Sequence, residues 1–300
     1  MLPSHRKCIR YLKNFCTLLL FLNTNAALIC LPPSTQSTLP IGRRSIFSRA
    51  CTAQNEELCN EIVEEIKLVA HELWRGDEIP ALSSTEDSFR ILDGEAELVD
   101  GVTFQERAEH FRRKALRGCP KSQHSYGLLL WSGFAGVQRD AEASAKFHAA
   151  AASQHHLDGM AVLGGCLRTG TGVKQNVALG LKIIEYCAST GNPTGTNKKG
   201  KLLESNQDDF GAVQLYEDCL KSGRVNALLL FSLGWCLVNG QGVHRKDTDR
   251  GIALWEEAAK KAPDEGSEEA AWYLYEEYKR DDPKEAKQWL DLAEELGYYV

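Results

Sequence analysis

The chain of 300 residues is 43% hydrophobic and 25% charged, which is the composition of a folded globular protein and excludes a largely disordered one. Its formal net charge is −6, yet residues 1–55 hold seven Lys and Arg and no Asp or Glu, which leaves 28 basic and 41 acidic residues in 56–300. Such an acidic body argues against nucleic-acid binding driven by electrostatics.

Residues 1–53 are expected to form a targeting leader that is cleaved from the mature protein. A basic start precedes an apolar run, Phe15 to Leu31, which Asn23 to Asn25 interrupt. This pattern is typical of a signal-peptide core and is too short and polar for a membrane span. An acid-free stretch with Pro, Ser, Thr and Arg follows, as in transit peptides. The two parts together resemble the leaders of plastid proteins; the secretory pathway or endoplasmic reticulum, a membrane anchor and an untargeted tail are the alternatives.

Residues 54–103 are expected to hold one helix and an acidic linker. Within 54–75, apolar residues recur at helical spacing, from Leu58 to Leu73, with glutamates mostly on the opposite side. Residues 76–102 are acidic and rich in turn residues, so they are interpreted as a loop.

A repeat array is expected over 104–300. Thr103 and Glu106 form a capping box that opens its first helix, and Gly118 is placed to end that helix. A phrase of the form Leu-Gly-x-Cys-Leu-x-x-Gly-x-Gly-Val occurs at 163–173 and again at 233–243, seventy positions later. Self-similarity of this kind predicts stacked helix pairs.

The predicted helix pairs have a looser copy of the phrase upstream, at Tyr126 to Val137. The expected boundaries of the five repeats are 119–155, 156–191, 192–223, 224–262 and 267–297. The third and fifth lack the glycine loop. In the others the loop glycines are predicted to supply backbone angles denied to other residues; they are Gly133, Gly136, Gly170, Gly172, Gly240 and Gly242.

These residues resemble the Sel-one-like repeats, a branch of the tetratricopeptide superfamily. The resemblance covers about 104–297 and is best at Leu163–Gly191 and Leu233–Ala259. It implies an all-α, right-handed solenoid of antiparallel helix pairs. It also implies a role in assembling protein complexes, including quality control at the endoplasmic reticulum.

The cysteines and histidines are the residues that could form a metal or redox site. None of the ten cysteines forms a Cys-x-x-Cys pair, and Cys166 and Cys236 take the same place in two repeats, so buried gap-filling thiols are expected, with disulfide staples as the alternative. His148 and His155 are spaced to share a helix face, but no dedicated metal motif surrounds them. We therefore expect no metal site.

Catalytic and nucleotide sites are not expected either. Gly195 to Lys201 is one residue short of a phosphate-binding loop and follows a helix end instead of a strand. No nucleophile elbow or distinct acid pair is present, so we predict no enzyme activity and no cofactor.

The resemblance implies that the first helix of each pair lines the concave face of the array and binds a protein or peptide partner there. Carried over around the Leu-Gly step, it gives these candidate partner-binding residues: His124, Leu128, Trp131, Arg168, Asn197, Lys201, Glu204, Phe231, Trp235, Val238, Trp272 and Lys279. Trp and Tyr dominate interface hot spots, which favours the aromatic members as anchors; packing between helices is the alternative for Trp131, Trp235 and Trp272. Trp255 and Trp289 are expected in the core.

The sequence therefore predicts a non-enzymatic scaffold or adaptor. An enzyme or metal-binding protein on the same scaffold, and a permanent structural subunit of a complex, are the two alternatives.

Overall fold

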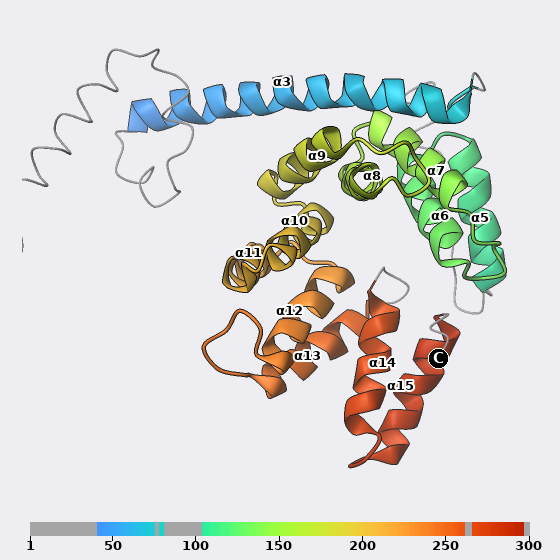
Figure 1. Ribbon diagram of the computed structural model, residues 1–300, viewed down its shortest axis with the longest axis vertical. Helices are drawn as coiled ribbons and strands as arrows, with labels where there is room; N and C mark the ends of the chain where they lie inside the picture. The colour runs from blue at the N-terminus through green and yellow to red at the C-terminus, as the bar shows by residue number, and fades with distance from the viewer. Residues whose placement is uncertain (1–40, 76–77, 81–103, 262–265, 297–300) are drawn as a thin grey trace, which may run out of the picture. The chain divides into compact units, whose positions relative to one another are not determined.

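The computed structural model describes residues 41–75, 78–80, 104–261 and 266–296. Across this part of the chain there are twelve helices and no strand (Figure 1), which is the predicted all-α class. The chain divides into two compact units, Met1–Asn60 and Glu61–Val300. Most of the expected leader and the acidic loop 81–103, with Thr103, lie outside the described residues.

The first described helix, α3, spans Ile41–Trp74 and is longer than the predicted helix 54–75. Its end was predicted correctly to one residue, but its start was placed too late. Between Arg43 and Arg75 the chain carries neither Gly nor Pro, so nothing in the sequence breaks the helix once it has begun. The amphipathic stripe from Leu58 to Leu73 lies within the second half of α3.

From Glu61 onward α3 belongs to the second compact unit and packs on the repeat array. Ile62, Ile66 and Ala70 are fully buried at a spacing of four residues, which is one helix face. Lys182 bridges Glu61 and Glu65 of α3 at 2.6 and 2.8 Å. The stripe and the ion pairs therefore attach the end of α3 to the array.

The array consists of α5 (Phe104–Leu116) and five helix pairs at the predicted repeat boundaries. The pairs are α6 (Pro120–Ser132) with α7 (Ala141–Ser153), α8 (Leu157–Thr169) with α9 (Val177–Ser189), α10 (Pro193–Ser205) with α11 (Asp209–Lys221), α12 (Ala227–Asn239) with α13 (Thr248–Ala259), and α14 (Ser267–Tyr278) with α15 (Pro283–Glu295). Helices within a pair and in neighbouring pairs contact one another, so the array is a repeat solenoid.

Most helices of the array begin with a side-chain cap. A cap oxygen accepts a hydrogen bond from a backbone N–H of the first turn, which would otherwise lack a partner. The residues that do so are Asp140, Asn176, Asn192, Asp208, Asn226, Asp247 and Asp282. These caps fix the start of the seven helices that they precede, and so help to set the length of the repeats.

The two helices of a repeat approach closely at the glycine of the Leu-Gly step. A Cβ on Gly234 would lie 2.7 Å from the Trp255 ring, and one on Gly127 would lie 2.8 Å from the His148 ring. A Cβ on Gly200 would overlap the ring of Tyr216. The missing side chain on the first helix thus creates the space that a ring of the second helix fills.

All six loop glycines have positive φ, as predicted, between 63° and 77°. A Cβ on Gly172 would overlap the carbonyl oxygen of Ala141, and one on Gly242 would overlap that of Asp209. Ala141 and Asp209 are the first residues of α7 and α11, so each loop lies against the second helix of the preceding repeat. The glycines are therefore needed both for their backbone angles and for this contact.

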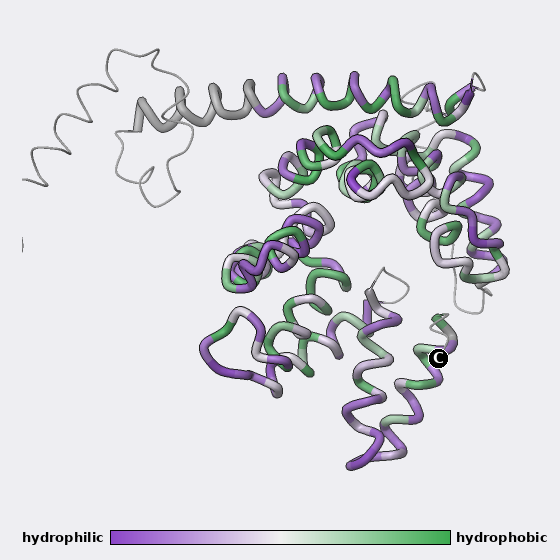
Figure 2. The backbone as a smooth tube through the Cα atoms, in the orientation of Figure 1, coloured by the Kyte–Doolittle hydropathy of each residue, from purple (hydrophilic) through white to green (hydrophobic). Residues whose placement is uncertain are grey.

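Five of the described cysteines, Cys119, Cys166, Cys187, Cys219 and Cys236, are buried. This matches the gap-filling interpretation, and the described residues contain no disulfide. The segment 227–239, α12, is predominantly apolar along its length (Figure 2). Even so, none of the helices described is both long and apolar enough to cross a membrane.

Replacing Gly172 with alanine is expected to destabilise the protein more than replacing Gly223. Gly223 also has positive φ, at 76°, but nothing lies within 4 Å of an added Cβ, so Gly223→Ala should cost only the left-handed backbone strain of roughly 1–2 kcal/mol. Gly172→Ala should cost about 1–3 kcal/mol more, because the added methyl overlaps a fixed carbonyl. Urea unfolding followed by circular dichroism would measure both, and equal losses would contradict the proposed loop contact.

Candidate partner-binding face

The first helices of successive repeats form a continuous row. α6 contacts α8, α8 contacts α10, α10 contacts α12 and α12 contacts α14, whereas the second helices of neighbouring repeats touch weakly or not at all. In a stacked array the more closely spaced row lies on the inner side of the bend. The candidate residues, which were taken from first helices, therefore belong to this inner row.

The candidate residues differ in how accessible they are. Trp131, Lys201 and Lys279 are exposed, with Trp131 at 41%, and Arg139 lies over the Trp131 ring at 5.4 Å. Lys279 pairs with Glu276 at 2.6 Å and lies 5.6 Å from the Tyr275 ring. The half-buried members are His124, Leu128, Arg168, Glu204, Phe231, Trp235, Val238 and Trp272.

Three candidates have a role inside the array. Asn197 is only 2% exposed, and its amide donates hydrogen bonds to Ser232 Oγ at 2.7 Å and to the Leu228 carbonyl at 3.3 Å. The prediction that Asn197 binds a partner is therefore wrong, because its buried amide joins α10 to α12. Val238 lies against Gly251 of α13, and His124 lies in a group of histidine rings described below.

Phe231 and Trp235 belong to a group of aromatic side chains that we call the aromatic cluster, with Tyr273 and Trp255. The Tyr273 ring lies 5.6 Å from Phe231, 4.9 Å from Trp235 and 5.4 Å from Trp255. Trp255, on α13, is buried as predicted and donates its Nε1–H to the Phe231 carbonyl at 3.2 Å. The other three rings are half-buried on α12 and α14, so the cluster rests on the core and is partly open to solvent.

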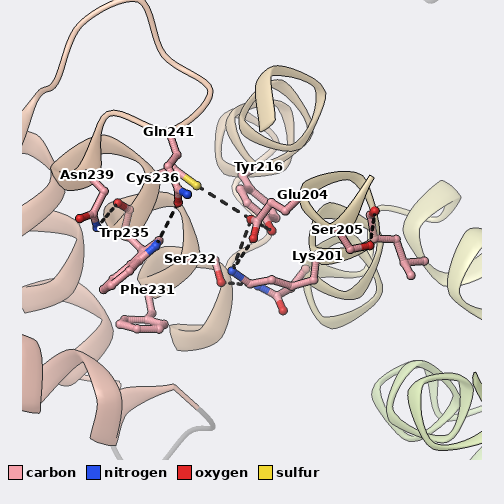
Figure 3. Close-up of polar contacts among 12 residues, drawn as sticks. Lys201, Glu204, Ser205, Tyr216, Phe231, Ser232, Trp235, Cys236, Asn239 and Gln241 are labelled. Carbon is pink, nitrogen blue, oxygen red and sulfur yellow. Dashed lines mark hydrogen bonds and ion pairs between the residues drawn. The ribbon is translucent and has the colours of Figure 1, made fainter. Parts of the chain in front are cut away.

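Lys201 and Glu204 form a polar network with Tyr216 and Cys236 (Figure 3). Glu204 Oε1 accepts a hydrogen bond from Tyr216 Oη at 2.9 Å, and Lys201 Nζ lies 2.9 Å from Glu204 Oε2. Burial, and then the negative charge of Glu204, raise the pKa of Tyr216 and raise that of Cys236 to about 12. Tyr216 and Cys236 are therefore uncharged at neutral pH, and Lys201 is the exposed end of the network.

The aromatic cluster and the polar network lie on adjacent first helices. Trp235 Nε1 donates to Gln241 Oε1 at 3.1 Å, which orients the indole toward the end of α12 (Figure 3). Cys236, the next residue, has its Sγ 3.9 Å from Glu204 of α10. One turn of α12 therefore connects the aromatic cluster with the polar network of Lys201 and Glu204.

Three histidine rings come together, but they do not include the pair His148 and His155 that the sequence suggested. His155 has φ 63° and lies beyond the end of α7, so it shares no helix face with His148. The rings that meet are those of His124, His148 and His156. Among the residues described, no group of three or more His, Cys, Asp or Glu is arranged to hold a metal ion.

The polar network of this face has no activated thiol among its members. The thiol of Cys236 is a poor nucleophile with its pKa raised, and the Glu204 carboxylate is engaged by Lys201 and Tyr216. Half-buried rings beside a charged pair are the groups that anchor protein partners.

Iodoacetamide at pH 8 is expected to leave Cys236 unmodified in the folded protein and to label it in urea. A thiol with a pKa of about 12 is almost wholly protonated at that pH, and the side chain is only 1% exposed. Mass spectrometry of the peptide that contains Cys236 would report the labelled fraction. Rapid labelling of the native protein would contradict both the burial and the network, and the half-buried Cys59 provides an internal comparison.

Comparison with known proteins agrees with the repeat boundaries. The Sel1 repeat model matches residues 120–156, 157–184, 228–263 and 268–298. The unmatched gap, 185–227, contains the whole third repeat, 192–223, which the sequence already sets apart by its missing glycine loop. No curated protein matches the chain.

Solved structures with similar folds share about a fifth of their residues with this chain. A Sel1 repeat protein from Oxalobacter formigenes is 21% identical, with 71% of this chain and 85% of that one covered and a TM-score of 0.44. An immunity protein from Pseudomonas aeruginosa is 18% identical, with 73% of this chain and 85% of that one covered and a TM-score of 0.46. A protective antigen of uropathogenic Escherichia coli with an SLR fold is 20% identical, with 81% of this chain and 56% of that one covered and a TM-score of 0.37.

The family evidence is the set of four matched repeats, together with the helix pairs and loop glycines found at the same positions. Residues 120–298 of this chain therefore carry four Sel1 repeats.

Proposed function

We propose that this protein is a non-enzymatic scaffold that holds a protein or peptide partner on the inner row of first helices, with the aromatic cluster as the main anchor. Sel1 repeat proteins are generally scaffolds for protein–protein interaction. The observation that carries the proposal for this chain is the aromatic cluster itself, whose rings Phe231, Trp235 and Tyr273 are half-buried. Phe231 and Trp235 are on α12, which contacts α10, the helix that carries the exposed Lys201.

The position of the cluster suits an anchor because its rings are already ordered. Trp235 is fixed by Gln241 and Tyr273, so little side-chain freedom is lost when a partner covers them. The Lys201–Glu204 pair lies on the neighbouring helix, where rim charges favour one orientation of the partner over another.

The enzyme alternative gains no support from the described residues. The group most like a catalytic constellation is the polar network of Lys201, Glu204, Tyr216 and Cys236, and its buried members are held in their uncharged, unreactive forms. Exposed large apolar side chains are distributed over several helices, which does not favour the permanent-subunit alternative; they are Leu68, Leu116, Trp131, Val177, Leu181 and Phe210.

For the address of the protein, we propose that residues 1–53 act as a two-part leader to a plastid, with the secretory pathway as the alternative. The basic, acid-free composition supports this proposal. A labelling enzyme fused after Val300 would leave the leader free and would identify both the compartment and the partner in the native cell. Diffuse cytosolic labelling with no stable neighbour set would contradict the leader and the scaffold together.

Once a partner is identified, the variant with both Trp235→Ala and Tyr273→Ala is expected to bind it about 30-fold more weakly or worse, since hot-spot truncation costs roughly 2 kcal/mol or more. Isothermal titration calorimetry would measure the loss. Phe210→Ala is the matched control, because Phe210 is an aromatic residue that is 57% exposed on a second helix.

Thermal unfolding must show that the double variant is still folded at the temperature of the assay. Unchanged affinity in a folded double variant, or an equal loss in Phe210→Ala, would contradict the anchor role of the aromatic cluster.

A further inference from the structure

The rings of His124, His148 and His156, which we call the histidine cluster, meet where the first repeat joins the second. The His124 ring centroid lies 5.2 Å from that of His148 and 5.3 Å from that of His156. His124 is on α6 and His148 is on α7, while His156 is the N-cap of α8 and accepts a hydrogen bond from the Gly159 N–H. The cluster therefore spans three helices and both repeats.

His148 is fully buried, and neither of its ring nitrogens has a hydrogen-bond partner. Its ring packs on Gly127, where an added Cβ would lie 2.8 Å away. Nδ1 of His124 is also buried without a partner. An unpaired polar atom in the interior is costly, and a charged ring with two N–H donors is more costly than a neutral one.

The groups that face the cluster do not compensate for a positive charge. His124, His156 and Lys198 of α10 all act to disfavour protonation of His148. The opposing charge is Asp158, whose Oδ1 accepts hydrogen bonds from Thr194 Oγ1 at 2.6 Å and from Asn192 Nδ2 at 2.9 Å. Its carboxylate is therefore already engaged by the third repeat.

We propose that the histidine cluster is an acid-sensitive joint between the first and second repeats. When the rings take up protons below neutral pH, they leave the pocket, and α6 and α7 separate from α8. Because the first helices of these repeats belong to the inner row, opening at this joint changes the face that a partner meets. The proposal rests on the arrangement of the rings and holds whether or not the scaffold function is correct.

The direction of the pH effect follows from the burial. Burial, and then the charge of His156, lower the pKa of His124 from 6.5 to about 4, and burial followed by His124 lowers that of His148. A freed ring regains its ordinary pKa, so the opened joint binds protons more tightly than the closed one. Closure is therefore fully favoured above about pH 6.5 and is progressively lost as the pH falls toward 4.

Hydrogen exchange of the full chain at pH 7 and pH 5, corrected for intrinsic rates, would test the joint. For one histidine with these two pKa values, protection of residues 120–169 should fall about 20-fold or more between the two pH values. Residues 227–259 serve as the internal comparison, since no histidine is buried in α12 or α13. Equal loss across both segments would overturn the proposal.

His148→Phe keeps a ring over Gly127 and removes the titrating group, so the pH dependence of protection should decrease by the contribution of that residue. His71→Gln, at an exposed position of α3, is the matched control and should behave like the unmodified chain. A pH response that is unchanged in a folded His148→Phe protein would contradict the joint.

Titration of the histidine rings by nuclear magnetic resonance gives an independent measurement on the unmodified protein, which does not require that His148→Phe folds. Titration of His124 and His148 near pH 6.5, with residues 120–169 still protected, would overturn the proposal. Rings that titrate only as that protection is lost would support it.

Discussion

The structure depends on the close approach of two helices at one glycine of the first helix in four of the five repeats. At the Leu-Gly step the first helix has no side chain, and the second helix places a group directly against its backbone. In the second repeat this group is another glycine, since a Cβ on Gly180 would lie 2.6 Å from the Gly164 carbonyl oxygen. In three other repeats it is a ring: His148, Tyr216 or Trp255. Dense packing around this point leaves little room for change.

The three rings occupy equivalent places, but they differ in whether their polar atoms have a hydrogen-bond partner. Tyr216 donates to Glu204, and Trp255 donates to the Phe231 carbonyl. His148 has no partner for either nitrogen. A tyrosine or tryptophan at this place carries no charge at neutral pH, whereas a histidine can gain one within the physiological range. The same packing against a first-helix glycine therefore places a side chain that titrates in the physiological range in the interior of the first repeat, but not of the third or fourth.

The sequence predicted the parts of the structure that are set by local rules. Repeat boundaries follow from caps and glycines, and the loop glycines, such as Gly172 and Gly242, have the expected positive φ because no other residue fits there. The start of α3 was missed because the amphipathic stripe begins only at Leu58, and no Gly or Pro between Arg43 and Arg75 marks a helix end. Helix class and repeat length are thus local properties that a single chain displays.

The candidate site was less predictable, because it depends on contacts between repeats. Asn197 has the register of a surface residue, yet its amide is buried against α12. His155 has helical spacing from His148, yet the chain leaves the helix between them, and His124 and His156 take the expected place. Spacing along one helix says nothing about which side chain of the next repeat arrives opposite. One signal was available: His148 follows Gly127 by 21 positions, as Trp255 follows Gly234.

The third repeat shows how the array compensates when a local rule is absent. Its short turn has no glycine loop to lie against the start of α9, where Val177 and Leu181 are 45% and 40% exposed. The junction is held by side chains instead: Asp158 of the second repeat accepts from Thr194 of the third, which in turn accepts from Asn226 of the fourth at 3.0 Å. A hydrogen-bonded chain of this kind tolerates small rotations that a glycine wedged against a carbonyl does not. Because the charges of His124 and His156 also act on Asp158, the carboxylate that holds the third repeat is coupled to the histidine cluster.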